Sequence, residues 1–337
     1  MKKAGRVGII GAGIGGLTVG RNLTAAGLIV EIFDKGRGPG GRVSSKRTQF
    51  GSLDFGAQVL PCKSDLFKLQ IEKWAKEGII VPHKSRKILK NPGIFEDEAE
   101  AERNIEKFMP KPKMSAIAVS LASGLNIKYE KLIDRVQKNE EKETWDLFTQ
   151  DGTSVGEFDW LIVNCPPLQA LKFLENTKIQ EKVKEVNMQP CWAVSLTFPE
   201  SLGIPLTDAK VECSEIINYI SNNSSRPDRV TIPETWVLHG TPAWSQEHLE
   251  DPLESVGFAL ENEFFKILNI STRVPLNRIV HRWRFSKVDN PLSGEGYLLD
   301  ESSKVAVCAD WCHGSFVEDA YLSATKLSDY FISRSSL

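Results

Sequence analysis

The sequence predicts an α/β protein with two parts: a doubly wound parallel sheet with a β-meander, and a second, mostly antiparallel sheet domain. Residues 6–34 read as an apolar strand, a glycine-rich turn, a helix and a second apolar strand. Short strand-like segments separated by turn residues follow over 127–164, and another apolar strand at 305–309 precedes the last helix. Strands that alternate with helices are typical of parallel sheets, whereas closely spaced short strands indicate a meander.

The glycine-rich turn follows the strand directly. Gly11, Gly13 and Gly16 have the spacing G-x-G-x-x-G. The first glycine permits the tight turn, the second lets the backbone approach a pyrophosphate, and the third allows the helix to pack on the sheet. The helix that begins near Ile14 would direct its free N–H groups and positive dipole end at the phosphates. The turn therefore predicts a Rossmann-type dinucleotide site.

The residues after the turn narrow the choice of dinucleotide. Asp34 ends the second strand, where a carboxylate can accept hydrogen bonds from a ribose diol. The loop that follows ends in Gly40-Gly41-Arg42, which favours FAD over NAD. We expect cofactor contacts from this part of the chain at Gly11, Gly13, Ile14, Gly15, Gly16, Asp34, Lys35, Arg37, Gly41 and Arg42.

The composition excludes several classes of function. The 337-residue chain has a net charge of −2, so no basic excess indicates nucleic acid or an anionic membrane as a partner. Its six cysteines form no C-x-x-C pair, and its five histidines have no metal-ligand spacing, so no metal site is expected. Neither a signal peptide nor an apolar run of membrane-spanning length is expected, and we predict a cytoplasmic protein.

The order of the remaining elements suggests a discontinuous organisation. We expect helices over 64–78, 115–123, 166–174 and 253–268, and strands at 127–129, 133–137, 145–149, 160–164, 192–198, 235–240 and 278–285. Residues 82–113 look irregular. A basic patch (Lys84, Arg86, Lys87, Lys90) and an acidic one (Glu96 to Glu102) in this stretch are interpreted as a solvated helix face. We assign 1–60, 112–167 and 288–337 to the FAD-binding domain, and 61–111 and 168–287 to the substrate domain, which would cover the flavin ring.

The end of the chain is predicted to complete the cofactor site. Asp310 ends the strand 305–309, and apolar residues at helical period run from Val317 to Phe331. Ser315 and Glu318 fit the capping box S-x-x-E, which would order the start of this helix and leave N–H groups directed toward a ligand.

Taken together, both ends of the chain resemble the flavin-containing amine oxidase superfamily. Asp54-Phe55-Gly56-Ala57-Gln58 is similar to a segment that passes close to the flavin in that superfamily, and Val136 resembles a meander position whose backbone recognises adenine. The resemblance implies that Arg42 reaches the pyrophosphate and that Asp310 faces the ribityl–phosphate part. It adds these expected contacts with non-covalently bound FAD: Ala57, Gln58, Val136, Asp310, Ser315 and Val317. Ala309 stands where the family usually has glycine.

Several strings resemble the renalase-like branch of the superfamily. They are the stretch 38–47 around Gly-Gly-Arg, the stretch 236–245 around His239, and His281-Arg-Trp283-Arg-Phe. This resemblance implies oxidation of isomeric, wrongly reduced NAD(P)H to NAD(P)+, with O2 taking the electrons. A second G-x-G-x-x-G is missing from the sequence, so a nicotinamide nucleotide would be a small-molecule substrate rather than a second tightly held cofactor.

His239 and Trp283 are the candidate catalytic residues of the substrate domain. Each lies in a strand-like segment with aromatic neighbours, and an aromatic wall suits a flat nicotinamide-like ring. Packing in the core is the competing interpretation for Trp283, as it is for Trp236 and Phe285, because large aromatics usually fill interiors. Cys308 and Cys312 flank Asp310 and are interpreted as small buried hydrophobes rather than a redox pair.

Three alternatives stay open at this point. The first is an amine or polyamine oxidase, which should have carboxylates or an aromatic cage in its pocket. The second, from another class, is a flavin-binding protein without turnover. A plain NAD-dependent dehydrogenase agrees least with Gly40-Gly41-Arg42 and Asp310.

Overall fold

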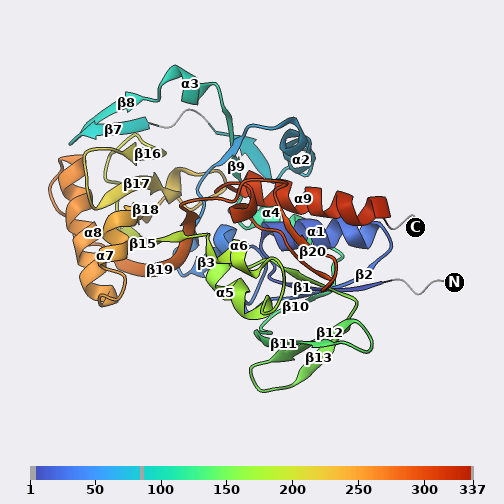
Figure 1. Ribbon diagram of the computed structural model, residues 1–337. Coiled ribbons are helices and arrows are strands. Elements are labelled where there is room, and N and C mark those ends of the chain that lie inside the picture. Colours follow the sequence, from blue (N-terminus) through green and yellow to red (C-terminus); the bar gives the residue numbers. More distant parts are fainter. Residues whose placement is uncertain (1–4, 84–86, 335–337) are drawn as a thin grey trace. The chain divides into compact units, whose positions relative to one another are not determined.

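The structure is a computed structural model that describes residues 5–83 and 87–334 (Figure 1). The chain divides into two compact units. Unit 1 contains the described residues of Met1–Gly41, Ile117–Met188 and Val288–Leu337; unit 2 contains those of Arg42–Ala116 and Gln189–Lys287.

Unit 1 is built on a mostly parallel sheet in the order β10-β2-β1-β14-β21-β20, as predicted for the nucleotide-binding part. Its strands are β1 (Arg6–Ile10), β2 (Ile29–Phe33), β10 (Ile127–Lys128), β14 (Trp160–Val163), β20 (Leu298–Asp300) and β21 (Val305–Val307). β1 lies between β2 and β14 in parallel register, with Gly8 opposite Glu31 and Leu161. Only β20 pairs antiparallel, at the edge beside β21. Parallel order brings the carboxyl ends of β1, β2, β14 and β21 to one edge, where ligands bind in open α/β sheets.

Two long helices of unit 1 pack against each other (Figure 1). They are α1 (Ile14–Ala25) and α9 (Val317–Arg334). Asn22 Nδ2 donates to Ser328 Oγ at 3.2 Å, which links helices nearly the whole chain apart. α1 was predicted from the glycine-rich turn before it and α9 from its apolar period, and both helices bury apolar side chains.

The meander is a sheet in the order β11-β12-β13. Its strands are β11 (Ile133–Asn139), β12 (Thr144–Thr149) and β13 (Ser154–Phe158). The turns at Asn139 and Asp151-Gly152 were predicted, but β13 was missed. Residues 127–128 were placed in the same run of strands, whereas as β10 they pair with β2 in the parallel sheet.

The segment after β14 belongs to unit 1, although 168–188 was assigned to the substrate domain. It forms α5 (Pro167–Ala170), the 3₁₀ turn η2 (Leu171–Phe173) and α6 (Gln180–Lys184). Its buried residues Phe173, Leu174 and Val183 share a core cluster with Val163 and Val307 of the parallel sheet. This apolar packing explains why the segment stays with the sheet.

Unit 2 contains a large sheet in the order β19-β15-β18-β17-β16-β7-β8. Its strands are β7 (Lys87–Asn91), β8 (Ile94–Asp97), β15 (Met188–Phe198), β16 (Asp208–Val211), β17 (Ile217–Asn222), β18 (Glu234–Gly240) and β19 (Asn277–Val288). One face packs on α8 (Leu253–Leu268), where Trp236 meets Phe264 with ring centroids 5.5 Å apart. Trp236 is therefore a core residue.

Smaller elements complete unit 2. They are the hairpin β3 (Ser45–Thr48) and β4 (Gly51–Asp54), the sheet of β5 (Leu60–Cys62), β9 (Glu106–Pro110) and β6 (Ile80–Pro82), and the helices α2 (Asp65–Lys76), α3 (Glu100–Arg103) and α7 (Pro242–Glu247). Residues 42–60 were assigned to the FAD-binding domain, but Leu53 and Phe55 pack with Ala193 of β15 in unit 2. The short helix α4 (Ala116–Ala122) follows β9.

The prediction of an irregular stretch and a solvated helix face over 82–113 was wrong. Lys87 and Lys90 lie on β7 and pair with β8, where Lys87 contacts Asp97 at 2.6 Å and Lys90 contacts Glu96 at 2.7 Å. Further along the acidic patch, Glu100 and Glu102 lie on the short helix α3. Alternating signs across an antiparallel pair stabilise it, which charge patterning alone did not distinguish from a helix face. Lys84 and Arg86 lie outside the described residues.

Within the described chain, every helix is too short or too polar to cross a membrane.

Candidate functional site

The glycine-rich turn of unit 1 has the geometry that its spacing predicts. Gly11 has φ +109°, and a Cβ there would lie 2.1 Å from the carbonyl oxygen of Asn164. A Cβ at Gly16 would lie 2.0 Å from the carbonyl oxygen of Gly11. Both positions therefore require glycine. α1 begins at Ile14, immediately after the turn, with Ile14, Gly15 and Gly16 buried.

Gly40 and Gly41 lie beside the glycine-rich turn. Gly13 and Gly40 form a parallel β-bridge, and Gly40 N donates to the carbonyl oxygen of Ala12 at 2.8 Å. Gly40 and Gly41 have φ +122° and +53°. The Gly-Gly step thus brings the loop back against the turn, and it forms a backbone cradle that a side chain at either position would disturb.

Asp34 closes this cradle from the end of β2. Its Oδ2 accepts from Ala12 N and its Oδ1 from Gly36 N, both at 2.6 Å. A carboxylate has about four lone-pair sites, so it can accept two further hydrogen bonds from a diol. Lys35 and Arg37 are exposed on the loop that follows.

Asn164 was missed by the sequence reasoning. It follows β14, and its Nδ2 donates to the carbonyl oxygen of Cys308, just beyond β21. Its Oδ1 would lie 3.2 Å from a Cβ at Gly13. One amide therefore joins the glycine-rich turn to the C-terminal strand. The available signal was a polar residue that ends an apolar strand ahead of Pro166.

Asp310 lies at the same sheet edge. It is 3% exposed and begins the 3₁₀ turn η4 (Asp310–Cys312), where its carbonyl oxygen accepts from His313 N and Gly314 N at 2.7 Å each. Ala309 before it has φ −163°, which is ordinary extended backbone. Alanine therefore fits where the family usually has glycine.

The start of α9 is capped by a residue that the predicted capping box does not include. The helix begins at Val317, and the capping carboxylate is that of Asp319: its Oδ2 accepts from Ser315 N at 2.9 Å and Phe316 N at 2.8 Å. Ser315 Oγ instead donates to the carbonyl oxygen of Val288 at 3.2 Å. Because Asp319 takes these two N–H groups, they are not left directed toward a ligand. The first turns of α9 still lie at the glycine-rich turn, since a Cβ at Gly15 would be 3.3 Å from the carbonyl oxygen of Ala320.

The remaining predicted contact in unit 1 is Val136, which lies on β11 opposite Leu147 and packs half-buried against the core of unit 1.

Three predicted cofactor contacts lie in unit 2. The carbonyl oxygen of Arg42 accepts from Ala57 N at 3.1 Å, and Arg42 Nη1 donates to the carbonyl oxygen of Ser286 at 3.0 Å. Gln58 is 6% exposed, and its Nε2 donates to the carbonyl oxygens of Asp54 and of Gly56. The Asp54–Gln58 segment is therefore a tightly bonded turn.

His239 and Trp283 both bind this turn. His239 Nε2 lies 2.9 Å from the carbonyl oxygen of Phe55, and Trp283 Nε1 donates to the same oxygen at 3.0 Å. His281 meets Trp283 edge-on, with ring centroids 4.4 Å apart, and lies 5.8 Å from the Phe55 ring. Trp283 and His281 are half-buried, and Trp283 packs against the small core cluster of Leu53, Phe55 and Ala193. We call His239, Trp283, His281, Phe55 and Tyr219 the His239 cluster.

His239 is held neutral. Burial is the main cause that lowers the pKa of His239 to about 4. The bond to Phe55 raises this pKa, and the charge of Arg226 lowers it. Because a carbonyl only accepts, Nε2 carries the proton and Nδ1 is an acceptor. The Tyr219 ring stacks on the imidazole with centroids 5.8 Å apart.

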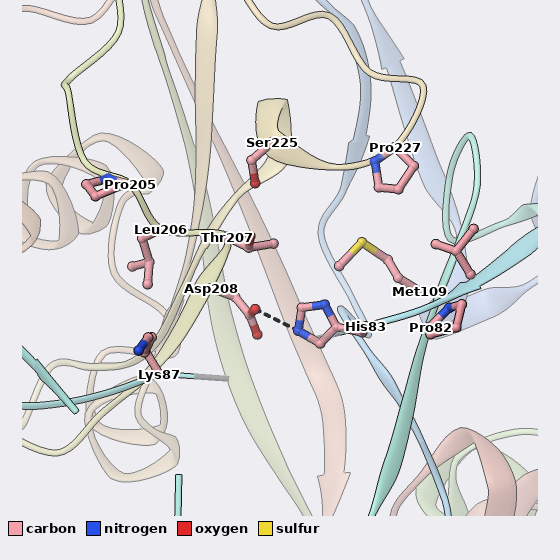
Figure 2. A pocket seen from close by; sticks show the side chains of 11 residues that line it. Pro82, His83, Lys87, Met109, Pro205, Leu206, Thr207, Asp208, Ser225 and Pro227 are labelled. Carbon is pink, nitrogen blue, oxygen red and sulfur yellow. Dashed lines mark ion pairs between the residues drawn. The ribbon is translucent and has the colours of Figure 1, made fainter. Parts of the chain in front are cut away.

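Unit 2 also contains a pocket of about 370 Å³ (Figure 2). His83 Nε2 lies 2.9 Å from Asp208 Oδ1 in its wall, and both side chains are nearly inaccessible. Tyr219 connects the pocket to the His239 cluster, because its hydroxyl donates to Asp208 Oδ2 while its ring stacks on His239. Apolar side chains, including Met109, Leu206 and Pro227, form much of the remaining wall.

The cysteines beside Asp310 are buried thiols. Burial raises the pKa of Cys308 to about 12 and that of Cys312 well above its usual value. Thiols that remain protonated are poor nucleophiles, which agrees with their interpretation as small hydrophobes.

The fold and the glycine cradle define a flavin-dependent oxidoreductase, and comparison with known proteins gives its family. A family model described as flavin containing amine oxidoreductase matches residues 89–330, and one described as NAD(P)-binding Rossmann-like domain matches 9–69. The chain belongs to the flavin-containing amine oxidoreductase family. It is an FAD-dependent enzyme, as predicted.

Solved structures of low sequence identity share the fold. A protein assigned as a protoporphyrinogen oxidase from Exiguobacterium sp. 255-15 matches with a TM-score of 0.79 at 12% identity, over 98% of this chain and 99% of that one. A putrescine oxidase bound to putrescine matches with a TM-score of 0.72 at 12% identity, over 98% and 100%. An oxidoreductase from Methanosarcina mazei matches with a TM-score of 0.67 at 15% identity, over 96% and 100%.

Proposed function

We propose that this enzyme oxidises a dihydronicotinamide-type substrate, an isomeric form of NAD(P)H, with O2 as the electron acceptor. The substrate loses a hydride and becomes NAD(P)+, and O2 takes the two electrons and two protons as hydrogen peroxide. One of these protons comes from the hydride and the other from solvent. The FAD that the residues of unit 1 would hold would supply the acceptor for this hydride and the route by which the electrons reach O2.

The residues of unit 1 fit the adenine dinucleotide part of the cofactor. The N–H groups at the start of α1 and the backbone around Gly11, Gly13 and Gly41 would hold the pyrophosphate, and Asp34 would accept from the ribose diol. The bonds of Asp34 to Ala12 and Gly36 orient its carboxylate before the ligand arrives. The other unit 1 candidates, Lys35, Arg37, Val136, Asp310, Ser315 and Val317, remain part of this proposal, as do Arg42, Ala57 and Gln58 of unit 2.

The electrostatic character of the His239 cluster is the observation that carries the choice of substrate. The imidazole of His239 is neutral, and the charged residues that act on the two histidines are cations. Besides burial, Arg226 lowers the pKa of His239 and Lys46 lowers the pKa of His281. A flat, neutral dihydropyridine ring with anionic phosphates suits aromatic walls beside cations. In the neutral tautomer, His239 Nδ1 can accept an N–H of the ring carboxamide.

Oxidation of an amine is the second candidate, favoured by the structural similarity to a putrescine oxidase. An ammonium substrate needs a carboxylate partner. The two buried carboxylates linked to the cluster are already engaged, Asp54 by Arg229 and Asp208 by His83 and Tyr219. This engagement favours the dihydronicotinamide. A flavin-binding protein without turnover is the third candidate.

Anaerobic mixing of the holoenzyme with 6-dihydro-NAD(P) tests the proposal. We expect the flavin absorption near 450 nm to bleach within seconds and to return when O2 is admitted. Bleaching by putrescine but not by the dihydronicotinamide would establish the amine alternative instead. A flavin that no reductant in a broad screen bleaches would indicate a binding protein.

A further inference from the structure

Two arginines and one aspartate form a buried charged group beside the Asp54–Gln58 turn. The side chains of Arg226, Arg229 and Asp54 are 1%, 4% and 1% exposed. Arg229 Nη2 donates to Asp54 Oδ2, and Arg226 Nη1 lies 3.5 Å from the same oxygen. One carboxylate therefore faces two guanidinium groups, and the group carries an excess positive charge.

The arginines are incompletely bonded. Arg226 Nε, Arg226 Nη1 and Arg229 Nε have no hydrogen-bond partner among the residues that the structure describes. Burial of charged donors without partners is costly, and a charge-balanced pair would avoid much of that cost. An excess charge kept in this place is therefore better explained by an electrostatic role than by stability.

The same arginines hold both ends of the turn that orients the His239 cluster. Arg229 Nη1 donates to the carbonyl oxygen of Ser52, before the turn. Arg226 Nη2 donates to Gln58 Oε1 at its end and to Ser221 Oγ of β17 at 3.0 Å. Between these ends lies the Phe55 carbonyl that binds His239 and Trp283.

We propose that Arg226 and Arg229 have two roles at the His239 cluster. They position its residues through the Asp54–Gln58 turn, and their excess positive charge favours anionic substrates over those that carry an ammonium group. This inference rests on the proposed function, because it assigns the charge of the substrate to the same cluster. A buried charge acts strongly across low-dielectric protein, so neither guanidinium needs to touch the substrate. Burial lowers the pKa of His239 most, and the charge of Arg226 lowers it further, in the direction that the proposal requires. The Tyr219 ring and the Phe55 carbonyl also face this imidazole.

The first test measures the potential without a substrate. In the holoenzyme, Arg226→Met removes the charge and leaves Asp54 and Arg229 as a neutral pair. NMR of labelled histidine, with His239→Gln to assign the signal, should show the pKa of His239 moving up toward its ordinary value. Arg226→Lys, which keeps the charge, should leave that pKa low. The matched control is Arg278→Met, which removes a guanidinium paired with Glu261 in the same unit.

The second test measures selection. The rate constants of flavin reduction are compared for an isomeric dihydronicotinamide mononucleotide and its riboside, which differ only in the phosphate. We expect Arg226→Met, but not Arg278→Met, to reduce the preference for the nucleotide about tenfold. Arg226→Gln, which keeps a donor for Gln58, serves if the Met variant does not fold.

An unchanged His239 titration together with an unchanged nucleotide-to-riboside ratio in a folded Arg226 variant would overturn the inference. If neither compound reduces the wild-type flavin, the proposed function fails, while the titration still decides the role of the arginine pair.

Discussion

His239 and Trp283 bind the same acceptor, since their ring N–H groups lie 2.9 and 3.0 Å from the carbonyl oxygen of Phe55. A carbonyl oxygen has two lone pairs, so a single backbone group can orient both rings. It also fixes the tautomer of the imidazole. Both sequence-derived catalytic candidates are therefore controlled by one residue of the Asp54–Gln58 turn, a relationship that no local pattern contains.

The neutrality of His239 predicts the pH dependence of flavin reduction. Because the pKa of His239 is lowered to about 4, the imidazole does not titrate between pH 5 and 8. The rate constant of flavin reduction, measured by stopped flow, should show no inflection near 6.5 from this residue. An inflection near pH 6.5 that is present in wild type and absent in His239→Gln would contradict the assignment.

The same shift predicts an effect on stability. Between about pH 6.5 and 4 the unfolded chain binds a proton at His239 that the folded chain does not, so stability rises with pH across this window and is lost as the pH falls through it. The contribution should be about 1–3 kcal/mol. Urea unfolding of wild type and His239→Gln at pH 4 and 7 measures it: the difference in unfolding free energy between the two pH values should be smaller in the variant.

Trp283→Phe should weaken substrate binding more than it slows turnover. It removes the donor to Phe55 and leaves an aromatic ring, a change of about 1 kcal/mol, or roughly fivefold in KM. Steady-state kinetics with the dihydronicotinamide separate KM from kcat. Trp244→Phe is the matched control, because Trp244 lies against the ring of His248 in the same unit, with centroids 4.4 Å apart. Equal KM values in both variants would show that the bond to Phe55 has no role.

The parts of the fold predicted from sequence are those with a strong local cause. The glycine turn, α9 and the buried strand β14 were predicted because G-x-G-x-x-G, a helical period and a continuous apolar run each act within a few residues. β16 and β17 were missed because both carry polar residues: Asp208 of β16 lines the pocket, and the hydroxyl of Tyr219 of β17 donates to it. Their strand signal is correspondingly weak.

The missed site residues have a different cause. Asn164, Arg226 and Arg229 act through partners that are far away in sequence, Cys308, Gln58 and Asp54. Single-sequence reasoning places residues along a strand or helix but does not show which distant segments meet. For the same reason the cap of α9 was predicted from Ser315 and Glu318, where the pattern S-x-x-E fits, although the carboxylate of Asp319 accepts from Ser315 N and Phe316 N.

Gly16→Ala should abolish cofactor binding. Its Cβ would lie 2.0 Å from the carbonyl oxygen of Gly11, so the helix would have to move away from the turn that we propose to hold the pyrophosphate. The ratio of flavin absorption to protein in the purified variant should fall at least tenfold, with a lower melting temperature. Gly38→Ala is the control, because a Cβ there meets nothing within 4 Å. Normal flavin content in Gly16→Ala would mean that the turn does not hold the cofactor.

Asp319→Asn should destabilise the start of α9. The carboxylate accepts from two N–H groups, and loss of its charge at a helix N-terminus costs about 0.5–2 kcal/mol. Thermal unfolding of the holoenzyme measures the loss. Ser315→Ala removes the bond to Val288 but leaves the cap, so it should cost less. A larger loss of stability in Ser315→Ala than in Asp319→Asn would support the predicted capping role of Ser315 instead.

Asn164 provides the sharpest test of how the two ends of the chain form one nucleotide site. Asn164→Asp keeps the shape of the side chain but replaces the donor to the Cys308 carbonyl with an oxygen, so two acceptors face each other at a cost of about 1–3 kcal/mol. The new negative charge beside Gly13 would also repel a pyrophosphate. Asn164→Ala removes the bond without adding charge. We therefore expect flavin release, followed by fluorescence, to be faster in both variants and fastest in Asn164→Asp, with a difference that shrinks at high salt. Equal rates of flavin release from Asn164→Asp and Asn164→Ala at every salt concentration would contradict this prediction. That result would mean that Asn164 only packs, and that the pyrophosphate does not bind near it.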